Sequence, residues 1–545
     1  MNKNNRVAPL AALGAALCSF GPVGSAEPAS DEYEIQRIVP PSAFHGIHGL
    51  AFDAHDRLFA GSVAGQSIYA VDTANGKVDT VVPAPEGMAD DLVFLADGTM
   101  VWTSISAGLV RARKGDEPVR VLARDLPSIN SINVRKSDGR LFAAQVFGGD
   151  GVWELDPAGV KPPRNILKDL GGFNGFDIGS DGMLYGPLWF KHQVVRIHPD
   201  TGELTVVADG FHTPAAANFD SRGNLYVLDT ARGELVRVDV KTGTKTVIAR
   251  LATSLDNLAI DSKDRIYVSN MADNAIHEVN PATGAVREVI KGKLATPRSI
   301  AAVASANGDE IFVADQFAFR KVNGKTGAVR DIARSHAANT PIAYANSVTA
   351  NDKHIILTNS NGNVQRYDRR TQRVLDEWSM RGAQTALELL DGSVLVANSP
   401  RGSITRLSGP KGEQRKTVVS DLAGPVALAL SPAGEVYISY AEAGEVAQID
   451  LTHGTKRIIA RELHRPQGLA FGTDGSLFVI ERDRKQLTRI DARTGSTEAV
   501  ATDLPVGRPG VPNATASVAA GTRGTLYVMS DVENSIYRLT PRKHH

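Results

Sequence analysis

Cysteine is almost absent from this chain of 545 residues: the only one is Cys18, so no intramolecular disulfide can form. Beyond residue 26, no stretch approaches the roughly 20 apolar residues needed to span a bilayer, and no helical periodicity is visible. The 60 basic and 60 acidic side chains cancel, so no net field favours nucleic acid or anionic lipid. We therefore expect an all-β protein with a small-molecule substrate and with no nucleic-acid or membrane partner. Its oligomeric state is left open.

Residues 1–26 have the layout of a secretory signal peptide. Lys3 and Arg6 give a basic start, an apolar stretch runs from Ala8 to Phe20, and small residues end at Ala26. Cleavage after Ala26 would release a periplasmic or secreted protein. Such a product would have to fold without disulfides, because Cys18 lies inside the removed segment.

The rest of the chain is repetitive. The segments 49–59, 174–185 and 467–478 are the clearest copies of a unit that recurs every 38 to 49 residues. Aligning the residue two before the first apolar position gives twelve equivalent positions: His48, Asp90, Asn130, Asn174, Ala215, Asp256, Arg298, Asn346, Gln384, Val426, Gln467 and Ala516. A chain of this length also exceeds the roughly 250–300 residues of one core, so two domains are expected.

Each unit contains four short apolar strands separated by Gly, Asp and Asn turns, which predicts a meander. Radial stacking of such sheets buries both faces of each, which favours propellers. We predict two tandem six-bladed β-propellers with twelve four-stranded blades, over residues 33–282 and 283–541. The alternatives are a single ring of twelve blades, a seven-plus-five division and an open solenoid.

Strand counting at the two ends of the chain suggests how the rings close. The segment 33–39 reads as an outer strand without a blade, and the last unit ends after its third strand near Leu539. We expect 33–39 to complete blade six, and 285–290 to open the second ring and complete blade twelve. This places the domain boundary near Pro281.

The aligned positions should surround the mouth of each channel. In the first ring they include two carboxylates, two amides and an imidazole: His48, Asp90, Asn130, Asn174 and Asp256. Holding so many polar side chains together is costly, and a bound divalent cation would offset that cost. Oxygen ligands indicate Ca²⁺, with Mg²⁺ as the alternative. Ordinary channel water is the competing interpretation. The second ring has no carboxylate at these positions, which argues against a metal there.

Aromatic and histidine side chains are expected in loops near the first mouth. An exposed aromatic wall indicates a binding surface for an apolar ligand, although these rings could instead pack between blades. The histidines could transfer protons or be bystanders. The predicted substrate-binding residues are Phe147, Phe173, Trp189, Phe190 and Phe211, and the histidines are His192 and His212.

Three first-strand motifs resemble those of the SMP-30/gluconolactonase family: Asn130-Ser-Ile-Asn, Asn174-Gly-Phe-Asp and Asp256-Asn-Leu-Ala. The resemblance implies a six-bladed propeller with a central divalent metal. It assigns Asn130 and Asn174 to the family's metal-binding amides, and Asp256 to its metal-binding aspartate and hydrolytic base. The family's metal glutamate is replaced by His48, and an additional blade separates Asn174 from Asp256. The repeats also resemble NHL-type and streptogramin-lyase-type propellers.

The leading functional hypothesis is a metal-assisted hydrolase that opens a lactone or ester of a fairly hydrophobic small molecule. Asn130, Asn174 and Asp256 would hold the cation, with help from Asp90 or His48, and Asp256 or a histidine would activate water. One alternative is a metal-dependent lyase in which His48 or His212 removes a proton. Another is a non-catalytic extracytoplasmic binding scaffold, since propellers host unrelated functions.

Overall fold

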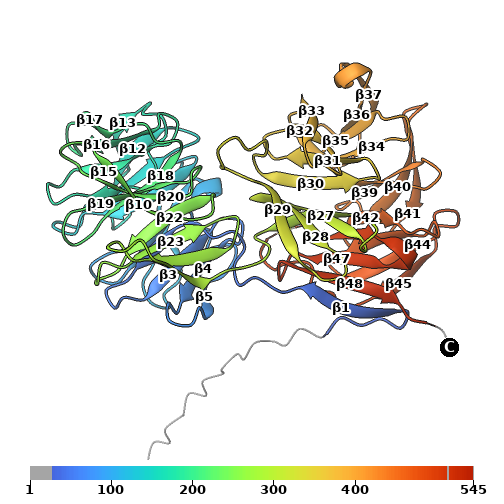
Figure 1. Ribbon diagram of the computed structural model, residues 1–545, viewed down its shortest axis with the longest axis horizontal. Coiled ribbons are helices and arrows are strands. Elements are labelled where there is room, and N and C mark those ends of the chain that lie inside the picture. Colours follow the sequence, from blue (N-terminus) through green and yellow to red (C-terminus); the bar gives the residue numbers. More distant parts are fainter. Residues whose placement is uncertain (1–26, 512–514, 544–545) are drawn as a thin grey trace, which may run out of the picture.

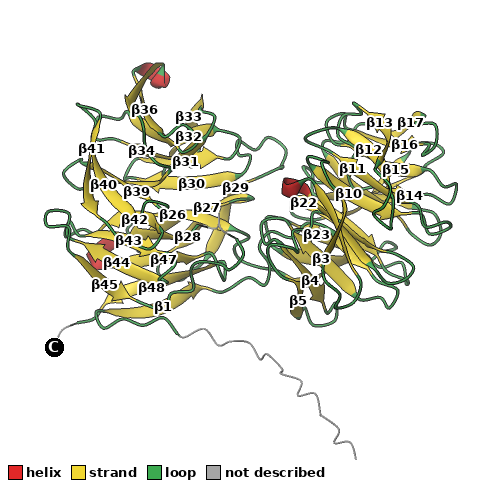
Figure 2. Cartoon of the chain, turned by 180° about the vertical axis from the view of Figure 1, so that it is seen from behind, coloured by secondary structure: helices red, strands yellow, loops and turns green. Residues whose placement is uncertain are grey.

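A computed structural model describes residues 27–511 and 515–543, so the predicted signal peptide lies outside the described residues. Those residues form twelve four-stranded antiparallel sheets. Short 3₁₀ turns, but no α-helix, accompany the strands within these ranges. The sheets are arranged in two bodies (Figures 1 and 2). The prediction of two tandem six-bladed propellers is confirmed.

The first propeller consists of six blades of four consecutive strands. Its strands are β2 (Leu50–Phe52), β3 (Leu58–Ser62), β4 (Ser67–Val71), β5 (Val78–Val82); β6 (Leu92–Phe94), β7 (Met100–Ser104), β8 (Leu109–Arg113), β9 (Arg120–Ala123); β10 (Ile129–Val134), β11 (Leu141–Gln145), β12 (Gly151–Leu155), β13 (Arg164–Lys168); β14 (Asp177–Ile178), β15 (Leu184–Leu188), β16 (Gln193–Ile197), β17 (Leu204–Ala208); β18 (Pro214–Phe219), β19 (Leu225–Asp229), β20 (Glu234–Val238), β21 (Lys245–Arg250); and β22 (Leu255–Ile260), β23 (Ile266–Asn270), β24 (Ala275–Val279), β25 (Val286–Ile290). The 3₁₀ turn η1 (Ile105–Ala107) follows β7.

The second propeller has five blades of consecutive strands and one blade shared between the two ends of the chain. Its strands are β26 (Pro297–Val303), β27 (Glu310–Asp315), β28 (Ala318–Asn323), β29 (Val329–Arg334); β30 (Ala345–Ala350), β31 (His354–Asn359), β32 (Asn363–Asp368), β33 (Val374–Ser379); β34 (Ala383–Glu388), β35 (Val394–Asn398), β36 (Ser403–Ser408), β37 (Gln414–Val419); β38 (Pro425–Leu430), β39 (Val436–Tyr440), β40 (Glu445–Asp450), β41 (Thr455–Ala460); β42 (Pro466–Phe471), β43 (Leu477–Glu481), β44 (Gln486–Ile490), β45 (Thr497–Ala501); and β46 (Ser517–Ala520), β47 (Leu526–Ser530), β48 (Ser535–Pro541), β1 (Tyr33–Val39). The 3₁₀ turns η2 (Pro410–Gly412) and η3 (Thr522–Gly524) lie in loops.

Burial follows position within a blade. Second strands such as β19 are buried along their whole length, because neighbouring blades cover both faces. Outer strands such as β21 are mostly exposed. The hairpin turns use left-handed backbone, as at Gly182 with φ of 76°. Within the described ranges no helix is long and apolar enough to cross a membrane.

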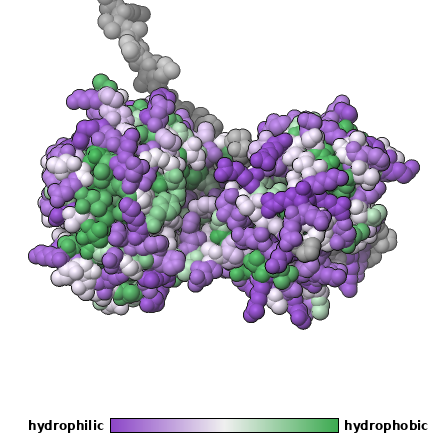
Figure 3. Space-filling view, turned by 90° about the horizontal axis from the view of Figure 1, so that it is seen from above, coloured by the Kyte–Doolittle hydropathy of each residue, from purple (hydrophilic) through white to green (hydrophobic). Residues whose placement is uncertain are grey.

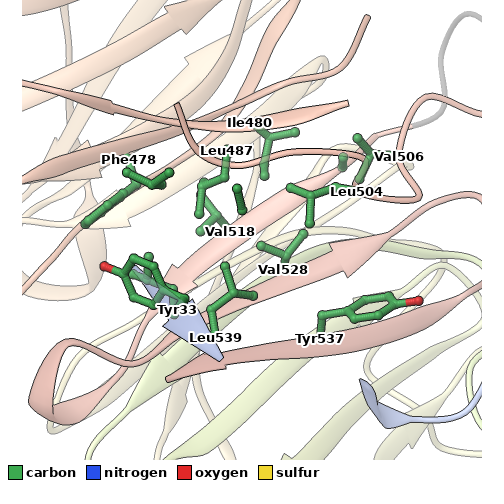
Figure 4. Close-up of a cluster of buried hydrophobic side chains, with 14 of the residues drawn as sticks. Tyr33, Phe478, Ile480, Leu487, Leu504, Val506, Val518, Val528, Tyr537 and Leu539 are labelled. Carbon is green, nitrogen blue, oxygen red and sulfur yellow. The ribbon is translucent and has the colours of Figure 1, made fainter. Parts of the chain in front are cut away.

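The two rings close differently from our expectation. β25 pairs with β24, so the first propeller completes its sixth blade with its own strand. β1 pairs with β48, with Tyr33 opposite Pro541, and completes the last blade of the second propeller. Tyr33 enters a core between the last two blades (Figure 4). The expected exchange of 33–39 and 285–290 was therefore wrong, because strand counting at the ends is satisfied equally by either pairing.

This pairing makes the first propeller an insertion between β1 and the rest of the second. The chain crosses to the first ring through residues 40–49 and returns through residues 291–296. Asn274 joins the two crossings, since its Nδ2 donates to the carbonyl oxygens of Phe44 at 2.6 Å and Leu294 at 3.1 Å. Ser42 Oγ also donates to the Leu294 carbonyl at 2.6 Å. Seen from above, the two bodies meet at a narrow waist, and hydrophobic residues gather on part of the first (Figure 3).

Candidate functional site

The aligned polar residues occupy the entry of each innermost strand. Asn130 and Asp256 lie in register irregularities where β10 and β22 depart from their ladders. His48 and Asp90 are anchored instead by backbone N–H bonds to Gly61 at 2.8 Å and Thr103 at 2.9 Å on the second strand of their own blades. Irregular strand starts re-aim side chains, and here they place a polar set at one end of the channel.

Three of these side chains form one compact cluster. One ring nitrogen of His48 and one carboxylate oxygen each of Asp90 and Asp256 lie within 4.8 Å of one another. His48 Nδ1 is 3.1 Å from Asp256 Oδ2. Asn130 Nδ2 donates to Asp90 Oδ2 at 3.0 Å. The cluster joins blades one, two and six, with Asn130 of blade three beside it.

A further carboxylate extends the cluster along the channel. Asp91 Oδ1 accepts from Asn257 Nδ2 at 3.0 Å, and its Oδ2 accepts from the Ile132 backbone at 3.1 Å. Asp91 is buried, as are Asp90 and His48. Sequence analysis missed Asp91 and Asn257, although each directly follows an aligned position.

The cluster carries an excess of negative charge. Burial, with added repulsion from Asp256, raises the pKa of Asp91 to about 7. Burial and the charges of Asp256 and Asp91 likewise raise the pKa of Asp90, while His48 opposes the rise. Burial alone would lower the pKa of His48, but Asp256 and Asp90 reverse the direction and raise it. No lysine or arginine of the described ranges is hydrogen-bonded or ion-paired to these carboxylates.

The donor set fits a divalent cation. The buried Nε2 of His48 has no hydrogen-bond partner in the described part of the chain. A bound cation would give this nitrogen a partner. It would also neutralise the carboxylates, because buried charges need a partner. Carboxylate and amide oxygens are ligands that Ca²⁺ accepts. Asn174 is buried at the equivalent position of blade four, and no described contact joins it to the cluster.

The second propeller reaches over this cluster, which sequence analysis did not anticipate. Phe317 lies edge-on against His48 with ring centroids 5.5 Å apart. Tyr344 contacts Phe317 at 5.7 Å, and its hydroxyl lies 2.8 Å from His336 Nε2. These three side chains come from the loops after β27 and β29, so their proximity to blade one depends on how the propellers dock.

The predicted aromatic wall is only partly present. Phe147 is 51% exposed and Phe190 is 55% exposed, and Phe147 contacts Trp189 at 6.0 Å and Phe190 at 6.1 Å. In contrast, Phe173 and Phe211 are buried in inter-blade cores. Their assignment to the substrate wall was wrong, because the residue preceding a first strand here points between blades.

His192 and His212 contact each other and not the cluster. Their rings lie 6.4 Å apart, and His192 Nδ1 hydrogen-bonds the His212 carbonyl. His212 Nδ1 lies 3.0 Å from Thr213 Oγ1. No contact among the described residues joins either histidine to His48 or Asp256, so neither is placed to act on a proton there.

Polar side chains at the equivalent positions of the second propeller are hydrogen-bonded to one another and to the backbone. Arg298 Nε donates to Asn346 Oδ1 at 3.0 Å, and Asn346 Nδ2 donates to the Gln384 carbonyl at 2.9 Å. Gln467 Oε1 accepts from the Ala516 backbone at 2.6 Å. The cluster of His48, Asp90 and Asp256 is the one potential metal-binding group found within residues 27–511 and 515–543.

Comparison with solved structures finds several distant similarities. A candidate gluconolactonase is 14% identical, with 49% of this chain and 99% of that chain covered and a TM-score of 0.38. The extracellular domain of a candidate one-component system from B. thetaiotaomicron is 10% identical, with 95% and 84% covered and a TM-score of 0.32. Tricorn protease is 13% identical, with 85% and 49% covered and a TM-score of 0.36.

Comparison with family models is more specific. Residues 376–498 match the model described as outer membrane protein assembly factor BamB. None of the curated proteins matches the chain. Residues 94–314 match the model described as SMP-30/gluconolactonase/LRE-like region. The resemblance to the SMP-30/gluconolactonase family is thus confirmed for the part of the chain that carries Asn130, Asn174 and Asp256.

Proposed function

We propose that the protein is a metal-assisted hydrolase that opens a lactone or ester of a fairly hydrophobic small molecule at the mouth of the first propeller. The observation that carries the proposal is the cluster of His48, Asp90 and Asp256, in which the carboxylates outnumber the one imidazole and have no lysine or arginine partner among the described residues. The family match over residues 94–314 supports lactonase-type chemistry. The exposed rings of Phe147 and Phe190 favour an apolar substrate.

We assign the cation to His48, Asp90 and Asp256, with Asn130 and Asn174 as further oxygen donors at the mouth. Ca²⁺ is the preferred ion, and Mg²⁺ the alternative, because most of these donors are oxygens. A divalent cation at this site supplies Lewis acidity toward a carbonyl oxygen.

The proton transfers are assigned to the protein. Asp256 accepts a proton from water as the water oxygen bonds to the carbonyl carbon. The bond from that carbon to the ring or ester oxygen then breaks, and the same proton passes to the departing alkoxide, so that a hydroxy acid, or an alcohol and an acid, result. His48, hydrogen-bonded to Asp256 Oδ2, fixes the orientation of this carboxylate.

Export to the periplasm or the exterior is part of the proposal. It is supported by the signal-peptide layout of residues 1–26. The match of residues 376–498 to the BamB model is compatible with that location.

The test is a screen of lactones and aryl esters with calcium and with chelator, followed by mass analysis of the products. We expect calcium-dependent turnover in which the product of a lactone, or the two products of an ester taken together, exceed the substrate mass by one water, and loss of turnover in Asp256→Asn. Products without added water would show a lyase instead. Calcium binding without turnover of any substrate would favour a binding scaffold and contradict the hydrolase.

A further inference from the structure

An arc of five aromatic rings crosses the mouth of the first channel. Trp189, on blade four, lies 5.3 Å from His336, which lies 5.2 Å from Tyr344. Tyr344 is 5.7 Å from Phe317, which is 5.5 Å from His48 on blade one. Blades one and four are opposite in a ring of six. The arc therefore spans the mouth, and its three central rings belong to the second propeller.

The middle of the arc is held in place by contacts with the first propeller. The Ala338 backbone N–H donates to the Ala231 carbonyl at 3.0 Å. Ser254 Oγ donates to the Ser335 carbonyl at 2.5 Å. The connection between β29 and β30 accordingly reaches from the second body toward the first (Figure 1). The loop that carries His336 and Tyr344 is thus seated on blades five and six.

His336 and Tyr344 lie close enough to the acidic cluster to feel its charge. The charges of Asp256 and Asp90 add to the effect of burial and raise the pKa of Tyr344. Burial lowers the pKa of His336 to about 4, opposed by Asp256 and assisted by His48. His336 is accordingly uncharged near neutral pH, and its Nε2 shares a hydrogen bond with the Tyr344 hydroxyl. When Nε2 carries the hydrogen, the Tyr344 hydroxyl hydrogen is left for another acceptor.

We propose that the second propeller forms the substrate-binding half of the first propeller's site, with the Tyr344 hydroxyl binding a substrate oxygen across the mouth from Asp256. The ring of Trp189 would contact the apolar part of the substrate, and the buried Phe317 would support the Tyr344 ring from behind. A site with carboxylates on one side and a roof of rings with one hydroxyl on the other fits a small, planar, aromatic carbonyl compound.

This inference rests on the proposed function for the reaction itself, but its test does not need turnover. The probe is benzoate, a small aromatic carboxylate of the kind that hydrolysis would release. Benzoate would be titrated into the calcium-loaded full-length protein, with binding followed by calorimetry and by the fluorescence of Trp189, using Trp189→Phe to identify that signal. The test variants are Tyr344→Phe and His336→Gln.

Matched controls lie elsewhere in the second propeller. Tyr437 hydrogen-bonds Glu435 at 3.1 Å on blade ten, and the exposed His453 contacts Asp450 at 2.7 Å. Tyr437→Phe and His453→Gln remove the same chemical groups away from the mouth. The shift of the melting temperature by calcium reports separately whether the cluster of His48, Asp90 and Asp256 is intact.

We expect benzoate binding about tenfold weaker in Tyr344→Phe, the size of one hydrogen bond, with an unchanged calcium shift and unchanged binding in both controls. Where an ester is turned over, KM should rise by a similar factor while kcat changes little. Wild-type affinity in Tyr344→Phe and His336→Gln, or no benzoate binding by the wild type, would overturn the inference. Weakened benzoate binding without turnover of any ester would support the shared site and contradict the hydrolase alone.

Discussion

Arg334 of the second propeller is ion-paired with Asp273 of the first, with Nη1 and Oδ1 2.9 Å apart. Both side chains are largely buried, at 14% and 5% exposed. Arg334 also donates to the Thr253 carbonyl at 2.9 Å and to Asn270 Oδ1 at 3.0 Å. Since Arg334 directly precedes the loop with His336 and Tyr344, this pair holds that loop against the first ring.

Replacing Arg334 by Met should weaken the contact between the propellers, so that they unfold independently. Removing one partner of a buried pair costs about 3–5 kcal/mol, because the other charge is left buried. We expect calorimetry to resolve two unfolding transitions, and the ester KM to rise as the Tyr344 loop loosens. Arg461→Met is the control, since Arg461 is 68% exposed in its pair with Glu445, and exposed pairs contribute less than about 1 kcal/mol. Equal effects of the two substitutions would contradict the role of Arg334.

The Asp273 carboxyl makes this contact sensitive to acid. Burial would raise its pKa, but Arg334 and Lys291 outweigh burial and lower it. A carboxyl whose folded pKa is depressed contributes stability above its unfolded pKa, about 3.9, and loses it as the pH falls through the folded value. We expect the wild-type melting temperature to fall more steeply than that of Asp273→Asn below about pH 4. An equal fall of the melting temperature with pH in the wild type and in Asp273→Asn would argue against a contribution of the Asp273 carboxylate.

The position of β1 predicts which propeller depends on it. Tyr33 is buried in the core between the last two blades of the second ring, so Tyr33→Ala should destabilise that ring by about 3 kcal/mol. In the Arg334→Met background, the transition of the second propeller should move while that of the first stays. The exposed Glu34→Ala serves as the control. A shift of the first propeller's transition would mean that β1 closes the other ring.

Chelation should destabilise the protein in a pH-dependent way. Without a cation, the pKa of Asp91 is raised to about 7 by burial and by Asp256. A carboxyl with a raised folded pKa contributes stability below its unfolded pKa that is lost as the pH rises through the folded value. In chelator, the melting temperature should fall between about pH 5 and about pH 8, and calcium should restore it at the upper end. Asp90→Asn should lose the calcium response, whereas the exposed turn variant Asp491→Asn should keep it. A calcium shift that survives in Asp90→Asn would place the ion elsewhere.

Asp256 and His48 should differ in their effects on turnover. Removing a general base typically costs about 10²–10⁴ in rate, so Asp256→Asn should lose that factor in kcat. His48→Gln should weaken calcium binding, measured by titration, and recover part of its activity at high calcium. His212→Gln should leave both quantities unchanged, because His212 contacts Thr213 and not the cluster. A loss of activity in His212→Gln comparable with Asp256→Asn would reverse these assignments.

Most of the cluster could be predicted because the repeat itself encodes its position. His48, Asp90 and Asp256 occupy one aligned site at the start of the innermost strands, so alignment of the units brings them to one channel mouth. Phe173 and Phe211 were assigned wrongly for a related reason. Their positions just before first strands place them near the mouth, but do not decide whether each ring points to solvent or between blades.

The sequence alone determined the local structure and the chemistry of each ring. Alternating apolar strands and glycine turns specify four-stranded blades whatever their neighbours, and the carboxylates at the aligned positions distinguish the first ring from the second. Only the tertiary structure decided that β1 joins β48, and that Phe317, His336 and Tyr344 cover the cluster. These contacts join residues hundreds of positions apart through strand edges and docked surfaces, and such pairings depend on distances in space that no periodicity in the sequence encodes.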